Sequence, residues 1–489
     1  MSNLFYKHPR TTHSTRRARR QLVAQLLIAL LSLSVGASRA AERSAQDIIA
    51  NYVREGLQSN LSLQRETLDV ERSQAALDAA RARFFPELAL AASYARSEGG
   101  RSIDLPLGNL VNPIYATLNQ LLSAQGKPAA FGQIDNSSIG FLLPRNQDSR
   151  LTLRQPVYAP AIPAAVNAQK ALLGAAEYAR VALARRLKRD ITVAWLNVVR
   201  SQKATAIYDS SNKLLQENLR VNESLLRNGK ITQDQVLRAR AELLATQQQL
   251  SEAHNLQSQA ANYLNYLLNR PLDSQIETAA VEDEISHATL DLASLRSAAL
   301  AARPELGQAN KNIEASRSQL RIARSAYWPT LSLGVDTGIQ GPDYQFGSGR
   351  NFDTISLLLN WKLFDAGGRS AQLHAMRAST RQAELAQDEL AQQIRLEVQQ
   401  ALDNLNTSSD GVATAKARAE AARAAFRIAS RKRDEGVINQ VEFMDARNTL
   451  SSAELNLNLT RFELLARQAD LDYATAAGSL PLNNGVSVP

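Results

Sequence analysis

Two hydrophobic patterns alternate along the chain, and the first of them repeats every two residues. In the segments 331–336 and 355–363, apolar residues alternate with polar or small ones. Such a period predicts β-strands with one apolar side. The segments 88–92 and 151–154 alternate less regularly, and we predict strands there too. At about 10 residues these strands have the length of tilted membrane strands, although a small soluble sheet would give the same pattern.

The second pattern is helical and occupies long stretches without proline. No proline occurs from residue 164 to 270 or from 343 to 480, and proline in a helix interior kinks or breaks the helix. The longest predicted helix would extend about 98 Å. The acidic segment 270–291 and the C-terminal tail are expected to form an irregular belt around the helices. We predict helices over residues 47–84, 164–228, 232–269, 292–326, 371–434 and 440–477.

The helical part of the chain contains an internal sequence repeat. The segment NGKITQDQVLRAR, which contains Gly229, matches EGVINQVEFMDAR, which contains Gly436, 207 residues later. Apolar heptad positions after each glycine correspond at the same spacing, which indicates two copies of one structural unit. We place the first repeat at 41–290 and the second, with its tail, at 291–489. The first repeat has about 37 extra residues between Ala95 and Gln147, and their Gly, Pro, Ser and Asn content predicts a long loop.

Residues 1–40 have the order of a secretory signal peptide. Four arginines between 16 and 20 precede the apolar run LVAQLLIALLSLSVG, and small residues end at Ala40. An uncleaved anchor is the alternative, but an apolar core of about 15 residues is shorter than the ~20 of a spanning helix. A twin-arginine signal is a further alternative, although the residues after Arg20 favour the general secretory route. We therefore predict cleavage after Ala40 or one residue later.

Charge and composition argue against several function classes. The formal net charge is +9, but seven of the positive charges lie in the predicted leader, which has no acidic residue, so +2 remains. This removes the main support for nucleic-acid binding. Without cysteine there is no disulfide, thiolate metal site or thiol nucleophile. The five histidines lack metal-binding spacing, and the glycines of 346–350 lack the helix of a phosphate loop. We expect neither a cofactor nor an enzyme.

The four predicted strands cannot close a sheet on their own. Backbone in lipid must be fully hydrogen-bonded, and known membrane barrels have at least about 8 strands. A cyclic trimer would combine four strands from each copy into twelve and remove the open edges. We therefore predict a homotrimer in contact with lipid. A secreted coiled-coil scaffold without membrane insertion is the alternative from another class.

The chain resembles the TolC-type outer-membrane efflux protein family. The resemblance rests on the order and spacing of several short motifs in a doubled chain, and it covers nearly all residues after the leader. These motifs are Arg303-Pro304-Glu305-Leu306, Tyr327-Trp328-Pro329, the segment from Leu359 to Gly368, and the turns at Gly229 and Gly436. The loop sequence LPLGNLVNPIYATLNQLL resembles that of a family subset with an enlarged outer loop.

The resemblance implies a mainly α fold with a trimeric 12-stranded transmembrane β-barrel, continuous with a long periplasmic α-helical barrel. It implies an outer-membrane location in a Gram-negative bacterium. It also implies docking onto a periplasmic adaptor protein and an inner-membrane transporter. The function implied is an exit duct for small molecules. The outer component of a type I protein secretion system has the same architecture and remains the alternative.

The resemblance also assigns roles to residues near the two turns. The turns would dock the adaptor through Gly229, Ile231, Gly436 and Ile438. Glu442 and Asp445, three residues apart on one helix face, would form the tunnel constriction. Ordinary solvated helix acids would look the same in sequence. Gating contacts are expected at Asp234, Gln235, Arg238 and Arg433, although Arg433 stands where the family often has an aromatic residue.

Overall fold

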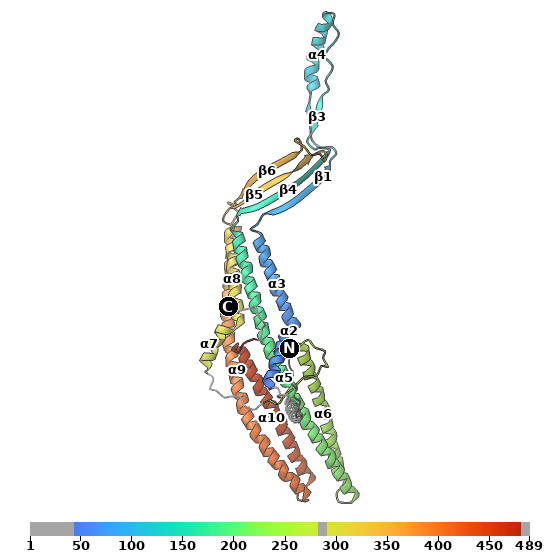
Figure 1. The fold of residues 1–489 in the computed structure, drawn as a ribbon, viewed down its shortest axis with the longest axis vertical. Coiled ribbons are helices and arrows are strands. Elements are labelled where there is room, and N and C mark those ends of the chain that lie inside the picture. Colours follow the sequence, from blue (N-terminus) through green and yellow to red (C-terminus); the bar gives the residue numbers. More distant parts are fainter. Residues whose placement is uncertain (1–43, 282–290, 481–489) are drawn as a thin grey trace, which may run out of the picture.

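The computed structural model describes residues 44–281 and 291–480. The predicted leader lies outside these residues. Within them the molecule is long and narrow: helical hairpins occupy one end, a curved sheet lies further along, and a thin projection containing α4 forms the other end (Figure 1). The sheet therefore separates the helical part from the projection.

One antiparallel sheet contains the four predicted strands, which are confirmed. It consists of β1 (Glu87–Arg96), β4 (Arg145–Tyr158), β5 (Thr330–Gly341) and β6 (Asn351–Asn360), in that spatial order. Its register places Leu88 opposite Leu153, Leu153 opposite Val335, and Val335 opposite Ile355. Directly paired residues share a face of a sheet. An apolar row therefore crosses one face from edge to edge.

Two hairpins of equal dimensions form the helical end. Helix α5 (Ala161–Arg227) and helix α9 (Gly368–Asp434) each have 67 residues, and α6 (Gln233–Leu267) and α10 (Gln440–Ala474) each have 35. All four helices begin and end 207 residues apart in pairs, the same spacing as in the sequence. In each hairpin the shorter helix packs against the tip-side half of the longer one (Figure 1).

Two predicted single helices are each divided in two, which corrects the sequence prediction. Helix α7 (Leu292–Ala302) stops at Arg303, whose ψ is 118°, because Pro304 begins α8 (Pro304–Ser325) and disfavours helical geometry in the residue before it. Helix α2 (Ala45–Ser59) stops at Asn60, which caps α3 (Leu61–Ala82) by accepting hydrogen bonds from Ser62 and Leu63. The Asn60 side chain also donates to Leu267 O at 2.9 Å, so the break anchors these helices to α6.

The core lies at mid-height, where α2, α5 and α6 meet. Trp195 and Ile191 of α5 and Leu264 of α6 are fully buried there. The indole of Trp195 donates to Glu277 O at 3.0 Å, and the Tyr52 hydroxyl accepts from Glu277 N at 2.8 Å. These bonds hold the irregular segment that follows α6 against the helices. The irregular segment predicted at 270–291 is present over residues 270–281, and 282–290 lie outside the described residues. Of the predicted tail, residues 475–480 are described, and Arg185 of α5 donates to Ala476 O there at 2.8 Å.

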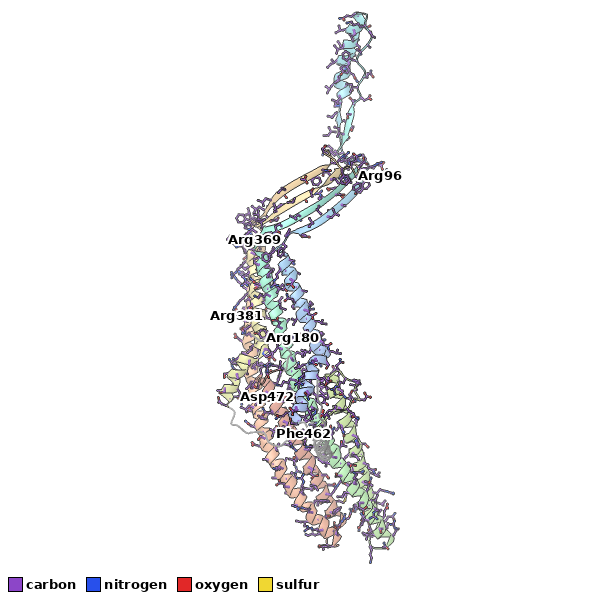
Figure 2. The ribbon with its side chains drawn as sticks, in the orientation of Figure 1. Arg96, Arg180, Arg369, Arg381, Phe462 and Asp472 are labelled. Atoms are coloured by element: carbon purple, nitrogen blue, oxygen red, sulfur yellow. The ribbon has the colours of Figure 1, made fainter. Side chains whose placement is uncertain are left out.

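Arg369 joins the sheet to the second hairpin. Figure 2 shows this residue where the strands end and the helices begin. Its guanidinium donates to Lys362 O at 2.6 Å and to Leu363 O at 3.1 Å, pairs with Asp365 at 3.0 Å, and lies 4.8 Å from the centre of the Tyr327 ring. Arg369 therefore fixes the chain between β6 and α9.

The long loop predicted between Ala95 and Gln147 is wrong for most of its length. The structure has a two-stranded ribbon there, β2 (Ser102–Leu105) and β3 (Ser137–Gly140), which carries the 18-residue helix α4 (Leu107–Ala124). Turn-forming residues dominate the composition of the segment and concealed an apolar helical period between its glycines and prolines. This projection leaves the sheet at the end opposite the hairpins (Figure 1).

Candidate functional site

The two hairpin tips have the same backbone geometry. Gly229 follows α5 with φ 65°, and Gly436 follows α9 with φ 73°. Lys230 N donates back to Leu225 O at 2.9 Å, and Val437 N donates back to Lys432 O at 2.7 Å. In each tip the residue after the left-handed glycine donates to a carbonyl five residues earlier, which is the hydrogen bond of a Schellman motif. A Cβ at either glycine would meet no atom within 4 Å, so the backbone conformation, and not space, requires glycine.

The tips present apolar side chains to solvent. Ile231 and Ile438, the predicted docking residues, are half-buried beside the turns. Around them Val437 is 67% exposed, Val441 58% and Leu237 55%. Exposed apolar residues gathered at one end of an elongated molecule are typical of a protein contact surface.

Glu442 and Asp445 lie on the first turns of α10, and both are exposed in the single chain. Glu442 also takes part in the helix cap. Asn439 Oδ1 accepts from Glu442 N at 2.9 Å, and Asn439 Nδ2 donates to Glu442 Oε1 at 3.1 Å. This reciprocal pair resembles a capping box, so Glu442 has a structural contact that Asp445 does not share.

The predicted gating residues fall into two groups. Asp234 and Arg238 pair along the surface of α6, with 3.9 Å between Oδ2 and Nε, and Thr232 donates its hydroxyl proton to Asp234. Gln235 is half-buried beside them. Arg433 lies on the other hairpin, so the structure groups the α6 residues with one another and places Arg433 elsewhere.

Arg433 connects the second hairpin to the first. Its guanidinium lies 4.1 Å from the centre of the Phe443 ring and donates to Asn218 Oδ1 on α5 at 3.4 Å. Phe443 is buried and lies 5.6 Å from Phe426, centre to centre. Arg433 therefore covers an aromatic pair instead of contributing an aromatic ring of its own.

A buried arginine that sequence reasoning missed also crosses between the hairpins. Arg447 of α10 donates to Glu242 Oε1 at 3.1 Å and to Thr246 Oγ1 at 3.2 Å, and both partners lie on α6. Burial lowers the pKa of Arg447, and the nearby Glu242 carboxylate opposes this by favouring the charged form. Arg447 corresponds to Arg240 in the other repeat. The presence of arginine at this position in both repeats, beside the apolar heptad residues, was the sequence signal that could have indicated it.

At mid-height the hairpins meet through apolar residues, since Phe462 of α10 lies in the same buried cluster as Trp195 of α5. Several other contacts between the hairpins are polar. We call this set the hairpin seam. It also includes Ser211 and Ser451, 3.0 Å apart, and Asn458, which donates to Arg200 O at 2.9 Å. Hydrogen-bonded groups can exchange their partners for water when surfaces separate, whereas apolar surfaces lose their burial. The seam is therefore the contact that can open at lower cost. Its side chains are Ser211, Asn218, Glu242, Thr246, Arg433, Arg447, Ser451 and Asn458.

Within residues 44–281 and 291–480, no cluster of His, Cys, Asp and Glu side chains has the arrangement of a metal site. Among the same residues, no helix combines the length and hydrophobicity needed to cross a membrane.

The fold is that of solved outer-membrane channels. The Campylobacter jejuni CmeC outer membrane channel superposes with a TM-score of 0.73 at 16% identity, over 90% of this chain and 87% of that one. The outer-membrane channel OprN gives a TM-score of 0.71 at 19% identity, over 88% of this chain and 90% of that one. At these identities the likeness establishes the mainly helical fold and its attached strands.

Sequence comparisons match parts of the chain to known proteins. Residues 295–477 match the family model described as outer membrane efflux protein. Protein CyaE of Bordetella pertussis is 30% identical over 158 residues, which are 32% of this chain and 33% of CyaE. The probable efflux pump outer membrane protein TtgC of Pseudomonas putida is 24% identical over half of each chain. The proteases secretion protein PrtF of Dickeya chrysanthemi is 24% identical over 46% of this chain and 49% of PrtF.

Over residues 295–477 this chain is similar to the outer membrane efflux protein family. The predicted resemblance is thereby confirmed for this part of the chain. The matches span about a third to a half of the length of these curated relatives.

Proposed function

We propose that this chain is one subunit of a homotrimeric exit duct. Its sheet would form part of a transmembrane barrel, and its hairpins part of a periplasmic tunnel. The observation that carries the proposal is the apolar row from Leu88 through Leu153 and Val335 to Ile355. In the single chain Leu88 is 60% exposed and Ile355 77%. An apolar face of this breadth requires a cover, and lipid provides one.

The opposite face of the sheet is polar, as the inside of a water-filled barrel would be. Thr152 donates to Asp336 across neighbouring strands at 2.5 Å, and Arg150 pairs with Asp148 on the same strand. Lipid-facing residues alternate with lumen-facing ones in membrane barrels. Strands of about ten residues tilted by about 45° span roughly the 25 Å of the apolar band.

Aromatic residues mark both ends of the strands. Membrane barrels carry such residues at the level of the lipid headgroups. At the outer end, the rings of Tyr94 and Tyr344 stack with centres 6.5 Å apart, and Phe346 is exposed beside them in the chain. The helix-side set is also exposed and consists of Phe85, Tyr158, Trp328, Trp361 and Phe364.

The trimer follows from the open edges of the sheet. Strands β1 and β6 each have one unpaired side in the described chain. Exposed strand edges are not tolerated in lipid, and three copies of a four-stranded sheet would pair every edge in a twelve-stranded barrel. We infer that the matched hairpins derive from two repeats, 41–290 and 291–489, after a signal peptide of residues 1–40.

The proposed activity is passage of small molecules received from a periplasmic adaptor and an inner-membrane transporter. The match to TtgC, whose name describes an efflux pump component, supports this reading. We propose that Gly229, Ile231, Gly436 and Ile438 shape the adaptor-docking surface. Glu442 and Asp445 would narrow the entrance, and Asp234, Gln235, Arg238 and Arg433 would influence its opening.

Fractionation and electrical recording test the duct. We expect the protein in the outer-membrane fraction, with a detergent-extracted mass of three chains and stepwise conductance in planar bilayers. Recovery as a monomer in the soluble periplasmic fraction would contradict the proposal and favour the coiled-coil scaffold.

Protein secretion is the second candidate because PrtF, a proteases secretion protein, matches nearly half of the chain. A deletion strain separates the two activities. Increased susceptibility to small toxic compounds with an unchanged set of secreted proteins supports efflux. Loss of a secreted protein, with unchanged susceptibility, supports secretion.

A further inference from the structure

The projection beyond the sheet carries an apolar helix face that nothing in the described chain covers. On α4, Leu110 is 64% exposed, Ile114 58% and Leu121 57%. Leu107, Ile114 and Leu121 are seven residues apart, and Leu110 and Leu118 fall between them on the same side. We call these five residues the α4 stripe. A seven-residue apolar repeat of this kind is the pattern of a helix that packs against other helices.

The side of α4 opposite the stripe packs against the segment that leads from α4 back to β3. We call this segment, which includes Phe131 and Ile134, the return segment. Asn112 exchanges two hydrogen bonds with the backbone of Ile134, both 2.8 Å long. Asn119 donates to Phe131 O at 2.8 Å and accepts from Phe131 N at 3.0 Å. At Gly108, a Cβ would lie 2.3 Å from Ile134 O, so glycine permits this close approach. The asparagines lie on the side of the helix opposite the stripe.

The return segment therefore fixes which side of α4 faces outward. The tilted contact between Tyr115 and Phe131, 5.1 Å between ring centres, adds to the same attachment. A side-chain amide can donate to a backbone carbonyl and accept from a backbone N–H at the same time. Each asparagine therefore makes to the return segment the two hydrogen bonds that a residue of a neighbouring β-strand would make. The stripe is thus the exposed face of a helix whose other side is fixed by hydrogen bonds and a ring contact to the return segment.

The absence of charge limits what can cover the stripe. No Asp, Glu, Lys or Arg occurs from residue 105 to 126, so the face offers no ionic attraction to a charged partner. Lipid is a poor occupant, because the projection lies beyond the outer ends of the strands, where the proposed barrel leaves the membrane (Figure 1). An uncharged seven-residue stripe is complementary to a second copy of itself.

We propose that the α4 stripes of three copies pack together into a helical cap on the outer side of the barrel. This inference rests on the proposed trimer. Helix α4 extends beyond the sheet roughly along the long axis of the molecule (Figure 1), and its ribbon is rooted between β1 and β4. With the threefold axis of the proposed trimer along that direction, three α4 helices, each about 27 Å long, project from the same end of the barrel. The cap lies over the exit and restricts it.

Single cysteines test the packing, because the chain has none of its own. Ile114→Cys places a thiol in the middle of the stripe. Ala116→Cys is the matched control, since Ala116 is exposed on the opposite side of α4. In intact trimers under mild oxidation, we expect at least fivefold more disulfide-linked dimer from Ile114→Cys than from Ala116→Cys. Equal cross-linking in intact trimers would overturn the cap.

Other occupants of the stripe give different results. Strong quenching by brominated lipid of a fluorophore attached to the Ile114→Cys thiol, without cross-linking, would mean that lipid covers the stripe. Rapid maleimide labelling in whole cells, again without cross-linking, would mean that the stripe is free or awaits an external partner. Either result overturns the cap while leaving the trimer intact.

Replacement of residues 106–136 by a short Gly-Ser turn tests the effect on the exit. The trimer should persist, and its conductance should rise by about twofold or more if the cap restricts the exit. A trimer with unchanged conductance would contradict the restriction. Failure of the unmodified chain to form trimers would instead contradict the proposed duct.

Discussion

Arg447 of α10 and Glu242 of α6 meet across the two hairpins, with 3.1 Å between Nη1 and Oε1. The side chain of Arg447 is 6% exposed and that of Glu242 is 31% exposed. A buried charge that loses its partner is costly. The pair therefore holds the hairpins together near their tips, and its removal should loosen the entrance.

Arg447→Met should destabilise the contact between the hairpins by about 1–3 kcal/mol, less than for a fully buried pair because Glu242 is partly solvated. The expected readout is a larger single-channel conductance and faster proteolysis at the tips. Arg240→Met is the matched control, because Arg240 occupies the corresponding repeat position and is exposed. Similar effects from both substitutions would show that the Arg447 contact has no special role.

The acidic pair Glu442 and Asp445 should make the channel cation-selective. Three copies would bring six carboxylates to the entrance, where they attract cations. Replacing both by alanine should reduce cation preference and weaken block by a multivalent cation added on the helical side. The effect should shrink in high salt, since screening acts over about 8 Å at physiological ionic strength.

Amide substitutions separate this charge effect from helix capping. Glu442→Gln retains an acceptor for Asn439, so Glu442→Gln with Asp445→Asn removes charge while preserving the cap. If the amide pair keeps wild-type selectivity and block, the two acids are solvated surface groups. The alanine variant would then differ only through lost capping.

The tip glycines should be sensitive to alanine for conformational reasons. At φ 65° and 73°, Gly229→Ala and Gly436→Ala should each cost about 1 kcal/mol, and asparagine should cost less. Gly174→Ala is the control, because Gly174 lies within α5 and only the flexible Lys311 side chain is close. There alanine should stabilise by up to about 1 kcal/mol. Thermal unfolding of the detergent-solubilised protein measures all three, and a loss at Gly174 equal to that at the tips would refute the argument.

Periodic features could be predicted from the sequence because local geometry determines them. The four strands, the long helices and the tip glycines each depend on a short-range pattern of apolar residues or turn residues. Where one residue interrupts a pattern, the prediction failed: Asn60 and Pro304 divide helices that were expected to be continuous. Pro304 was a visible signal, because proline interrupts a helix interior, whereas an asparagine such as Asn60 carries no comparable signal in sequence.

The hairpin seam could not be predicted because it depends on contacts between distant parts of the chain. Asn218 stands on α5 as an ordinary polar residue in sequence, yet it is buried. Arg447 reaches Glu242 across 205 residues. A repeat alignment shows which positions correspond, but it does not show which face of one hairpin meets the other. For the same reason the roles of Glu442 and Asp445 stay predictions.

Asp190 on α5 should make stability depend on pH. Burial raises the pKa of its carboxyl group, although Arg189 and Arg186 act in the opposite direction. A raised folded-state pKa means that ionisation opposes folding above that pKa. Asp190→Asn should therefore raise Tm at neutral pH, and the difference from wild type should shrink as pH falls through the folded pKa towards the ordinary value of 3.8. A pH-independent difference would contradict this assignment.

An epitope inserted after Gly126 should be displayed on the surface of intact cells. Gly126 follows α4, the helix of the projection, has φ 71°, and a Cβ there would meet no atom within 4 Å. Because the projection leaves the sheet opposite the periplasmic hairpins, this site should face the exterior. Antibody should label whole cells at a level comparable to that after permeabilisation. The same epitope inserted after Gly229 should be labelled only after the outer membrane is permeabilised. The reverse pattern would invert the assigned topology, and it would place the α4 stripe in the periplasm.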